Sequence, residues 1–149
     1  MKILIINGPN INMLGIREPE IYGGESYADL LEFIRGAAAD LGVEASFFQS
    51  NSEGAIIDAI QAAYGKLDGI VINPAAYTHT SIAIPDALKS VAIPAVEVHL
   101  TDISSREPYR RVSYTAEACI KTIAGEGFAG YRAAIAELVR RHANDVARF

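Results

Sequence analysis

The sequence has few of the residues that mark several common classes of protein. Its 149 residues contain one cysteine, Cys119, and no tryptophan. Because that cysteine has no partner in the chain, an intrachain disulfide and a cysteine-based zinc site are both excluded, and a reduced, cytoplasmic protein is expected. No apolar run reaches the roughly 18 residues of a transmembrane helix. The apolar run at residues 3–6 is too short for a signal peptide, so export is not expected.

Positive charge is also scarce. Lysine and arginine number 13 against 18 aspartate and glutamate residues, which gives a net charge of −5 and a pI near 5.1. Nucleic acids and anionic membranes are bound through a basic field, so neither is expected as a partner, although a local cationic pocket is compatible with this balance. The length predicts a single domain over residues 1–149, without linkers or repeats.

Short β-branched runs alternate with segments in which apolar residues recur every three or four positions, a pattern typical of βα units. The predicted strands are residues 3–6, 43–48, 69–72, 94–98 and about 119–124, and helices are predicted to start near Ser26, Glu53, Thr80 and Gly127. Ser26 and Ser52 are predicted N-caps, and Gly42 and Gly65 are predicted to end the first two helices. The stretch after Thr101 is not assigned.

Continuous apolar strands suit a parallel sheet that is buried on both faces. We predict an α/β fold, a flavodoxin-like three-layer sandwich with a five-stranded parallel sheet of order 2-1-3-4-5. In such sheets ligands bind at the carboxyl ends of the strands, near the point between the first and third strands where the order reverses. The segments after residues 6, 72 and 98 are therefore the expected location of a site.

Polar residues gather in these segments. They are Asn7, Asn10, Arg17, Tyr22, Asn73, His79, His99, Arg106 and Arg110. Two isolated histidines among amides and arginines, without the spacing of metal ligands, favour anion binding and proton transfer. The sequence thus indicates a small, anionic, hydroxyl-rich substrate.

Simpler explanations exist for these residues. His79 precedes a predicted helix and could only cap it, and His99 ends a core strand, where a structural histidine is common. Glu97 lies two residues before His99, on the same face of the strand, where its carboxylate could orient the imidazole. That pairing favours a functional over a purely structural role for His99. The tyrosines Tyr64, Tyr77, Tyr114 and Tyr131 are predicted to pack with their hydroxyls exposed.

A turn-rich loop contains Arg17 and Tyr22. A nearby guanidinium stabilises a phenolate, and a closing loop could carry such a base over a substrate. An ordinary surface loop with a solvent-facing arginine is the alternative.

Residues 125–130, GEGFAG, match the GxGxxG fingerprint of dinucleotide sites. The fingerprint also needs a second strand with an acidic residue about 20 positions on, whereas the acidic residue at that distance, Asp145, lies in a charged segment that is not predicted as a strand. We therefore predict that these glycines allow close packing of a helix on a strand. A nucleotide-binding domain is the alternative, and it predicts affinity for NAD or FMN.

Six segments taken together, NGPNINMLG, REPEIYG, FQSNSEG, INPAAYTHTS, EVHLTDI and REPYR, resemble the type II 3-dehydroquinate dehydratases in order and spacing. The resemblance runs from residue 3 to about residue 140. It implies dehydration of 3-dehydroquinate to 3-dehydroshikimate by anti elimination through an enolate, in the shikimate pathway or in quinate breakdown. It also implies no cofactor and a homododecamer built as a tetramer of trimers.

The same resemblance implies a role for individual residues. Tyr22 matches the general base, Arg17 the group that lowers the pKa of that tyrosine, and His99 the general acid. Asn10 matches a residue that holds a water on the enolate. The implied substrate-binding residues are Asn73, His79, Leu100, Thr101 and Arg110, together with Asp86 from a neighbouring subunit.

The chain departs from the family pattern at Ser52, Pro85, Asp102 and Ser104. Asp102 adds a negative charge beside the expected carboxylate site and is expected to weaken binding of an anionic substrate. A non-catalytic flavodoxin-like protein that binds a small acid is the competing hypothesis, which loss of Arg17, Tyr22 or His99 would favour. All three are present.

Overall fold

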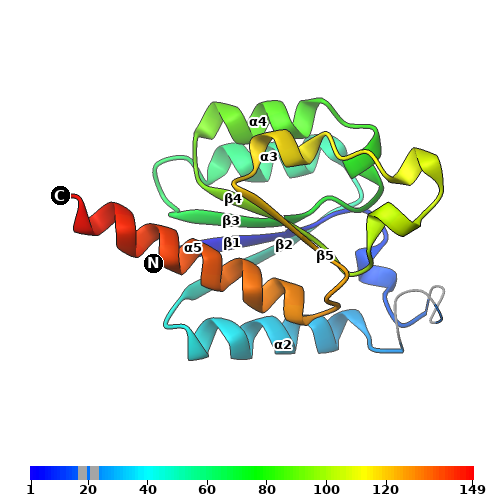
Figure 1. The fold of residues 1–149 in the computed structure, drawn as a ribbon, viewed down its shortest axis with the longest axis horizontal. Coiled ribbons are helices and arrows are strands. Elements are labelled where there is room, and N and C mark those ends of the chain that lie inside the picture. The colour runs from blue at the N-terminus through cyan, green and yellow to red at the C-terminus, as the bar shows by residue number, and fades with distance from the viewer. Residues whose placement is uncertain (17–19, 21–23) are drawn as a thin grey trace.

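A computed structural model describes residues 1–16, 20 and 24–149. Five parallel strands form one sheet of order β2-β1-β3-β4-β5, as predicted (Figure 1). The strands are β1 (Lys2–Asn7), β2 (Glu44–Gln49), β3 (Gly69–Asn73), β4 (Ala95–His99) and β5 (Lys121–Ala124). The helices are α2 (Tyr27–Asp40), α3 (Glu53–Ala62), α4 (Ala83–Val91) and α5 (Ala129–Ala147). Short 3-10 helices are η1 (Ile11–Met13), η2 (Ala75–His79), η3 (Ile103–Ser105), η4 (Pro108–Arg110) and η5 (Thr115–Ala118).

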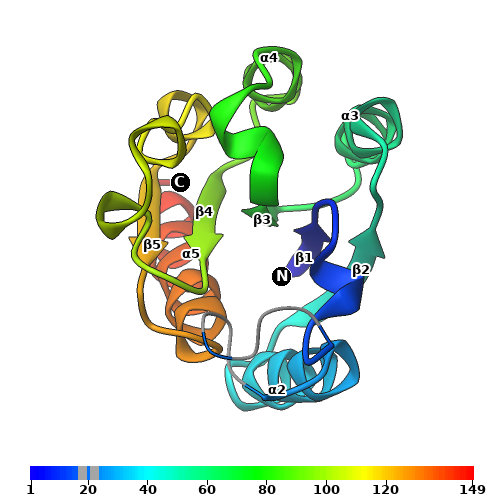
Figure 2. The same ribbon diagram turned by 90° about the vertical axis from the view of Figure 1, so that its right-hand side faces the viewer.

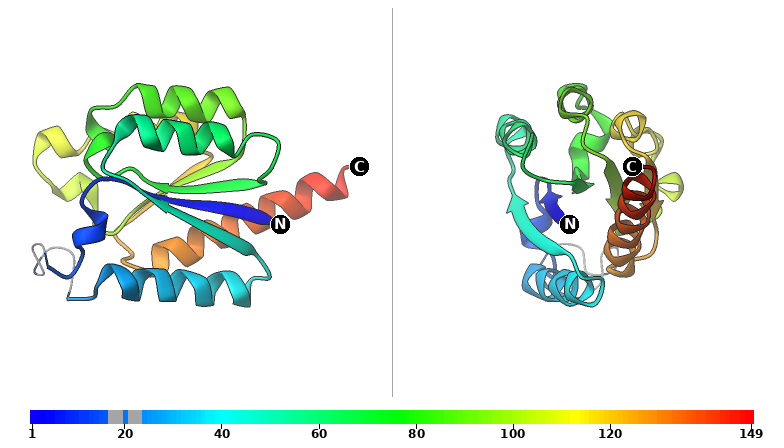
Figure 3. Two further views of the ribbon diagram at one scale, coloured as in Figure 1. Left: turned by 180° about the vertical axis from the view of Figure 1, so that it is seen from behind. Right: turned by 90° about the vertical axis from the view of Figure 1, so that its left-hand side faces the viewer.

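The sheet lies between two layers of helices, which confirms the three-layer sandwich (Figures 1 and 3). Helices α2 and α5 cover one face and α3 and α4 the other, because alternate residues of each strand point to opposite faces. In β1, Ile3 and Ile5 pack under α2 and α5, whereas Leu4 and Ile6 pack under α3 and α4. No helix in the described part of the chain is long and apolar enough to cross a membrane.

The two predicted N-caps and the glycine after the first helix are confirmed, whereas α3 ends at Ala62, before the predicted Gly65. The Ser26 hydroxyl accepts from the backbone N–H of Asp29 at 3.1 Å, while the Asp29 carboxylate accepts from the N–H of Ser26 at 2.9 Å. This reciprocal pair fixes the start of α2. Ser52 likewise caps α3 by accepting from the N–H of Ala55. Gly42 follows the end of α2 with a φ of 70°, a conformation that favours glycine.

Two predicted boundaries are wrong. The fifth strand was placed at about 119–124, but only Lys121–Ala124 pair with β4, because the chain first makes the 3-10 turn η5 and Cys119 donates its N–H back to Ala116. The helix predicted near Thr80 begins at Ala83. The Ser81 hydroxyl accepts from the N–H of Ile84 at 3.0 Å and so starts this helix later.

Strands β1 and β3 meet closely where they end. Asn7 and Asn73 are neighbours in the register, and the N–H of Gly8 donates to the carbonyl of Asn73 at 2.8 Å. A Cβ atom at residue 8 would lie 2.5 Å from the carbonyl oxygen of Pro74. Only glycine fits between the two backbones.

Tyr131 of α5 ties the same two strand ends together. Its hydroxyl donates to Oδ1 of Asn7 at 2.6 Å and accepts from Nδ2 of Asn73 at 3.1 Å, and the residue is fully buried. Burial raises the pKa of Tyr131, so the side chain is neutral. The prediction of an exposed hydroxyl is therefore wrong for Tyr131, because the start of α5 packs directly on the sheet.

The GEGFAG glycines serve two purposes. A Cβ at Gly130 would lie 3.4 Å from Cγ1 of Val98, which confirms close packing of α5 on β4 at this position. Gly125 and Gly127 instead have φ values of 80° and 56° and shape the turn between β5 and α5.

Replacing Tyr131 by Phe is expected to lower the free energy of unfolding by about 1–3 kcal/mol, because inside the fold Oδ1 of Asn7 then loses a donor and Nδ2 of Asn73 loses an acceptor. Urea unfolding at neutral pH measures the loss. Tyr64→Phe is the matched control, since that side chain is 68% exposed. Equal midpoints for Tyr131→Phe and the control would show that the buried hydroxyl contributes no stability.

Candidate active site

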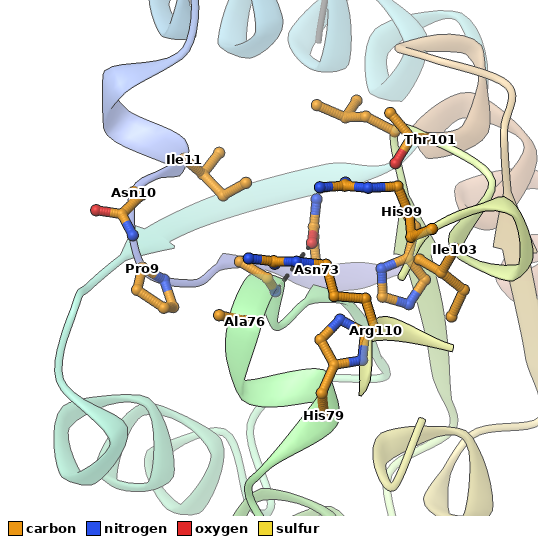
Figure 4. Close-up of a pocket in the computed structure, with 13 residues that line it drawn as sticks. Pro9, Asn10, Ile11, Asn73, Ala76, His79, His99, Thr101, Ile103 and Arg110 are labelled. Atoms are coloured by element: carbon orange, nitrogen blue, oxygen red, sulfur yellow. Dashed lines mark hydrogen bonds between the residues drawn. The ribbon is translucent and has the colours of Figure 1, made fainter. Parts of the chain in front are cut away.

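The carboxyl ends of β1, β3 and β4 surround a pocket of about 170 Å³, at the edge of the sheet seen in Figure 2. Its lining comes from the segments predicted to form a site. The lining residues are Pro9, Asn10, Ile11, Asn73, Ala75, Ala76, His79, His99, Leu100, Thr101, Ile103, Arg106 and Arg110. Figure 4 shows His79, His99 and Arg110 on one side of the pocket, with Pro9 and Asn10 on the other.

His99 is held by Glu97 inside the fold. The Nε2 atom of His99 lies 2.7 Å from Oε1 of Glu97, which confirms that the two side chains share a face of β4. Glu97 is fully buried and His99 is only 5% exposed. Because a carboxylate accepts and does not donate, Nε2 carries the proton in this contact. The other ring nitrogen, Nδ1, is the one that Glu97 leaves for a ligand in the pocket.

Two hydroxyl groups complete the surroundings of Glu97. Ser113 donates to Oε1 at 2.5 Å, and Thr122 donates to Oε2 at 2.8 Å. Burial acts to raise the pKa of Glu97, but the hydrogen bonds from His99, Ser113 and Thr122 together hold that pKa below its ordinary value. The carboxylate is therefore ionised at neutral pH and stabilises a protonated imidazole. Neither hydroxyl could be assigned to the site from the sequence, because Thr122 looks like an ordinary residue of the predicted fifth strand and Ser113 lies in the unassigned stretch after Thr101.

Asn73 presents a fixed amide to the pocket. Its Oδ1 accepts from the N–H of Ala75 at 3.1 Å, and its Nδ2 donates to Tyr131. These two contacts distinguish the oxygen from the nitrogen and prevent the amide from turning over. The second Nδ2 hydrogen is available to a hydroxyl group of a ligand.

His79 does not act as a helix cap, so that alternative is wrong. Its Nδ1 lies 2.7 Å from the carbonyl oxygen of Val112, which can only accept. Nδ1 therefore carries the proton, and in the neutral ring Nε2 accepts a hydrogen bond. The ring lines the pocket at the end of η2.

The pocket is cationic in a chain of net negative charge, as the sequence allowed. Arg106 and Arg110 both line it. Each also lies near the carboxylate of Glu107, at Nε to Oε2 distances of 3.6 and 3.4 Å. These guanidinium groups suit an anionic ligand.

Some predicted site residues lie elsewhere. Asp86 is exposed on α4 and does not line this pocket. Arg17 and Tyr22 fall outside the described residues. Leu100 and Thr101 directly follow β4 and line the pocket beside His99.

Two departures from the family pattern contact each other. The Asp102 carboxylate accepts from the hydroxyl of Ser104 at 2.6 Å and from its N–H at 3.0 Å, and these hydrogen bonds lower the pKa of Asp102. The carboxylate thus caps η3 and is directed at its own turn. A third departure, Pro85, is buried in the first turn of α4, where a proline is tolerated.

Cys119 lies near the same carboxylate as His99. Burial, followed by the charge of Glu97, raises the pKa of Cys119 to about 12. The thiol is therefore neutral and a poor nucleophile at neutral pH. Within residues 1–16, 20 and 24–149, no group of three His, Cys, Asp or Glu side chains could hold a metal ion.

Comparisons with known proteins agree with one another. A family model described as dehydroquinase class II matches residues 1–139. The 3-dehydroquinate dehydratase of Clostridium acetobutylicum is 63% identical over 131 residues, which cover 88% of this chain and 91% of that protein. Catabolic 3-dehydroquinase 1 of Aspergillus terreus is 53% identical over 134 residues, covering 90% and 88%. The type II dehydroquinase structure from Butyrivibrio crossotus aligns with a TM-score of 0.91 at 52% identity, covering 93% and 97%.

Glu97→Gln is expected to change how stability depends on pH. A carboxyl group with a lowered pKa stabilises the fold above its ordinary value of 4.5, and this contribution is lost as the pH falls through the lower folded value. The variant should be less stable than the wild type at pH 7, by about 1–3 kcal/mol, and should lose less on acidification. Urea unfolding between pH 7 and pH 3 measures both effects.

Glu126→Gln is the control for that experiment, because Glu126 is exposed. If the stability of the wild type and of Glu97→Gln depends on pH in the same way, the ionised Glu97 carboxylate does not stabilise the fold.

Proposed function

This chain belongs to the class II dehydroquinase family, and we propose that the pocket between Asn73 and His99 is where it carries out the family's reaction. The chain dehydrates 3-dehydroquinate and is therefore a lyase. The observation that supports this site best is the buried Glu97, which holds His99 at the end of β4 in a cationic pocket. The proposed product is 3-dehydroshikimate.

The proposed base is Tyr22, with Arg17 beside it. The phenolate of Tyr22 removes a proton from the carbon next to the ketone and leaves an enolate. Arg17 favours the phenolate by its positive charge. Both assignments rest on the REPEIYG motif, since neither residue is among those described. Asn10, which lines the pocket, is proposed to hold a water on the enolate oxygen.

The proposed acid is His99. Its Nδ1 hydrogen passes to the C1 hydroxyl of the enolate, the carbon–oxygen bond breaks in an anti elimination, and water leaves. The imidazole is then neutral, with its remaining hydrogen on Nε2 facing Glu97. Glu97 supports this step because its negative charge stabilises the imidazolium before the transfer.

The proposed binding groups surround this pair. Asn73 donates to a substrate hydroxyl, His79 accepts from one through Nε2, and Arg110 pairs with the anionic part of the substrate. The backbone amides of Leu100 and Thr101 are proposed to bind the carboxylate. The position of both residues at the end of β4, beside His99, supports this role.

We further propose that residues 1–149 form one catalytic domain, that the protein acts in the cytoplasm, and that the reaction uses no cofactor. The same dehydration serves aromatic amino acid biosynthesis and quinate breakdown.

The proposed assembly is a dodecamer made of four trimers, in which Asp86 completes the site of a neighbouring subunit. Its exposure on α4, away from the pocket of its own chain, supports action on another subunit.

Tyr22→Phe and His99→Ala are each expected to lower kcat by about 10²–10⁴-fold, because each removes a proton-transfer group. The ultraviolet absorbance of the conjugated enone of the product measures turnover after 3-dehydroquinate is added. Tyr64→Phe and His142→Ala are the matched controls. A folded wild type that binds the substrate without forming the enone would instead favour the non-catalytic binding protein, and an active Tyr22→Phe would remove Tyr22 from its role.

Asp86→Ala is expected to lose activity alone and to regain it in mixed assemblies. If Asp86 acts in the neighbouring site, co-refolding equal amounts of Asp86→Ala and His99→Ala should give about a quarter of the wild-type activity, since that fraction of random neighbours supplies both side chains. Activity that stays at the sum of the separate variants would mean that Asp86 serves its own subunit or none.

A further inference from the structure

Glu97 receives more support than its contact with His99 requires. Its carboxylate accepts three hydrogen bonds, and two of them come from hydroxyl groups to which no role has been given. Ser113 lies before η5, and Thr122 lies on the edge strand β5, so two separate segments converge on this group. Oε1 is shared by His99 and Ser113, while Oε2 is taken by Thr122.

A fully buried carboxylate retains its charge only when hydrogen-bond donors replace the water it has lost. His99 alone supplies one such donor. Burial by itself favours the neutral acid, and the two hydroxyls act against it. Ser and Thr hydroxyls donate without adding charge, so they stabilise the anion and leave its attraction for the imidazolium in place.

We propose that Ser113 and Thr122 are positioning residues of this active site, which keep the Glu97 carboxylate ionised and aimed at His99 so that the shared proton stays on the imidazole. The inference rests on the proposed role of His99 as the acid. It adds two residues to that role, neither of which touches the pocket.

The two hydroxyls determine whether the proton shared by His99 and Glu97 lies on the imidazole or on the carboxylate. When the His99 and Glu97 pair holds a single titrating proton, it forms either an imidazolium beside a carboxylate or an imidazole beside a carboxylic acid. Only the first form has a hydrogen on Nδ1 to give to the leaving hydroxyl while Nε2 keeps its own. Without the two hydroxyls the population of the second form increases. The proton then lies on Glu97, from which it cannot pass to the substrate.

Other titratable groups surround the pair in the described part of the chain. Cys119, at the end of η5, interacts with Glu97 and stays neutral. His79, Arg106 and Arg110 line the pocket with His99. Lys89 of α4 and Glu117 of η5 pair with each other at 3.9 Å on the surface. Substitutions at residues 113 and 122 leave all of these side chains in place.

Thr122→Val is the first test, because it removes the hydroxyl from an exposed residue and keeps the branched shape. We expect kcat to fall about tenfold, because the variant loses one hydrogen bond to a charged group. KM should stay within about twofold of the wild type. The alkaline limb of the pH–rate profile should move to higher pH. Losing the hydroxyl destabilises the deprotonated His99 and Glu97 pair more than the protonated pair, so the pair binds its proton more tightly. Thr122→Ser should restore both values.

Thr115→Val is the matched control. Thr115 is a fully buried threonine of η5 whose hydroxyl has no hydrogen-bond partner among the described residues, so its removal takes nothing from Glu97. Ser113→Ala is the second test, although that hydroxyl also accepts from the N–H of Ala116 at 3.1 Å. Ser113→Thr retains both contacts and should rescue it. Circular dichroism and thermal unfolding establish that each variant is folded.

The outcomes separate the two proposals. A wild type that forms no enone, or a His99→Ala variant that is fully active, would overturn the proposed function itself. If the wild type is active and His99 is required, the inference fails when Thr122→Val and Ser113→Ala both match Thr115→Val. It fails equally if kcat falls while the alkaline limb stays in place or moves to lower pH, since that pattern indicates a structural role alone.

Discussion

The buried charge of Glu97 is the constraint on which the rest of the site depends. A carboxylate at the centre of β4 has no water to solvate it, so the fold must bring donors to it from elsewhere. It does so from three places: the end of its own strand, the segment before η5, and the edge strand β5. The need to solvate one group therefore fixes the ring of His99 and ties β4 to the chain that follows it.

A second, neutral network performs a similar task on the other side of the pocket. Tyr131 joins Asn7 and Asn73, and the latter also accepts from the N–H of Ala75. A charged cluster thus orients the imidazole of His99, and an uncharged one orients the amide of Asn73. Because these hydrogen bonds hold the His99 ring and the Asn73 amide in place, both side chains reach the pocket already oriented, which reduces the ordering needed on binding.

Much of this arrangement follows from local patterns in the sequence. Apolar runs and turn residues predicted five parallel strands and their order, and the spacing of Glu97 and His99 placed both on one face. The contacts of Ser113, Thr122 and Tyr131 could not be predicted in this way, because they join residues 16, 25 and 124 positions apart. A serine before a 3-10 turn, a threonine on an edge strand and a tyrosine on an amphipathic helix look like surface or packing residues until the fold brings their partners close.

The contact of Gly8 with Pro74 sets a limit on how this site can evolve. The backbone of Gly8 lies directly against the backbone of Pro74, so the distance between them cannot be changed by a larger or smaller side chain. The spacing of β1 and β3 is therefore set by two backbones, whereas Ala76 and Ile103 line the pocket with side chains that can change in size. Adaptation to a larger or smaller acid must therefore proceed through the side chains that line the pocket, with the contact between the ends of the first and third strands left as it is.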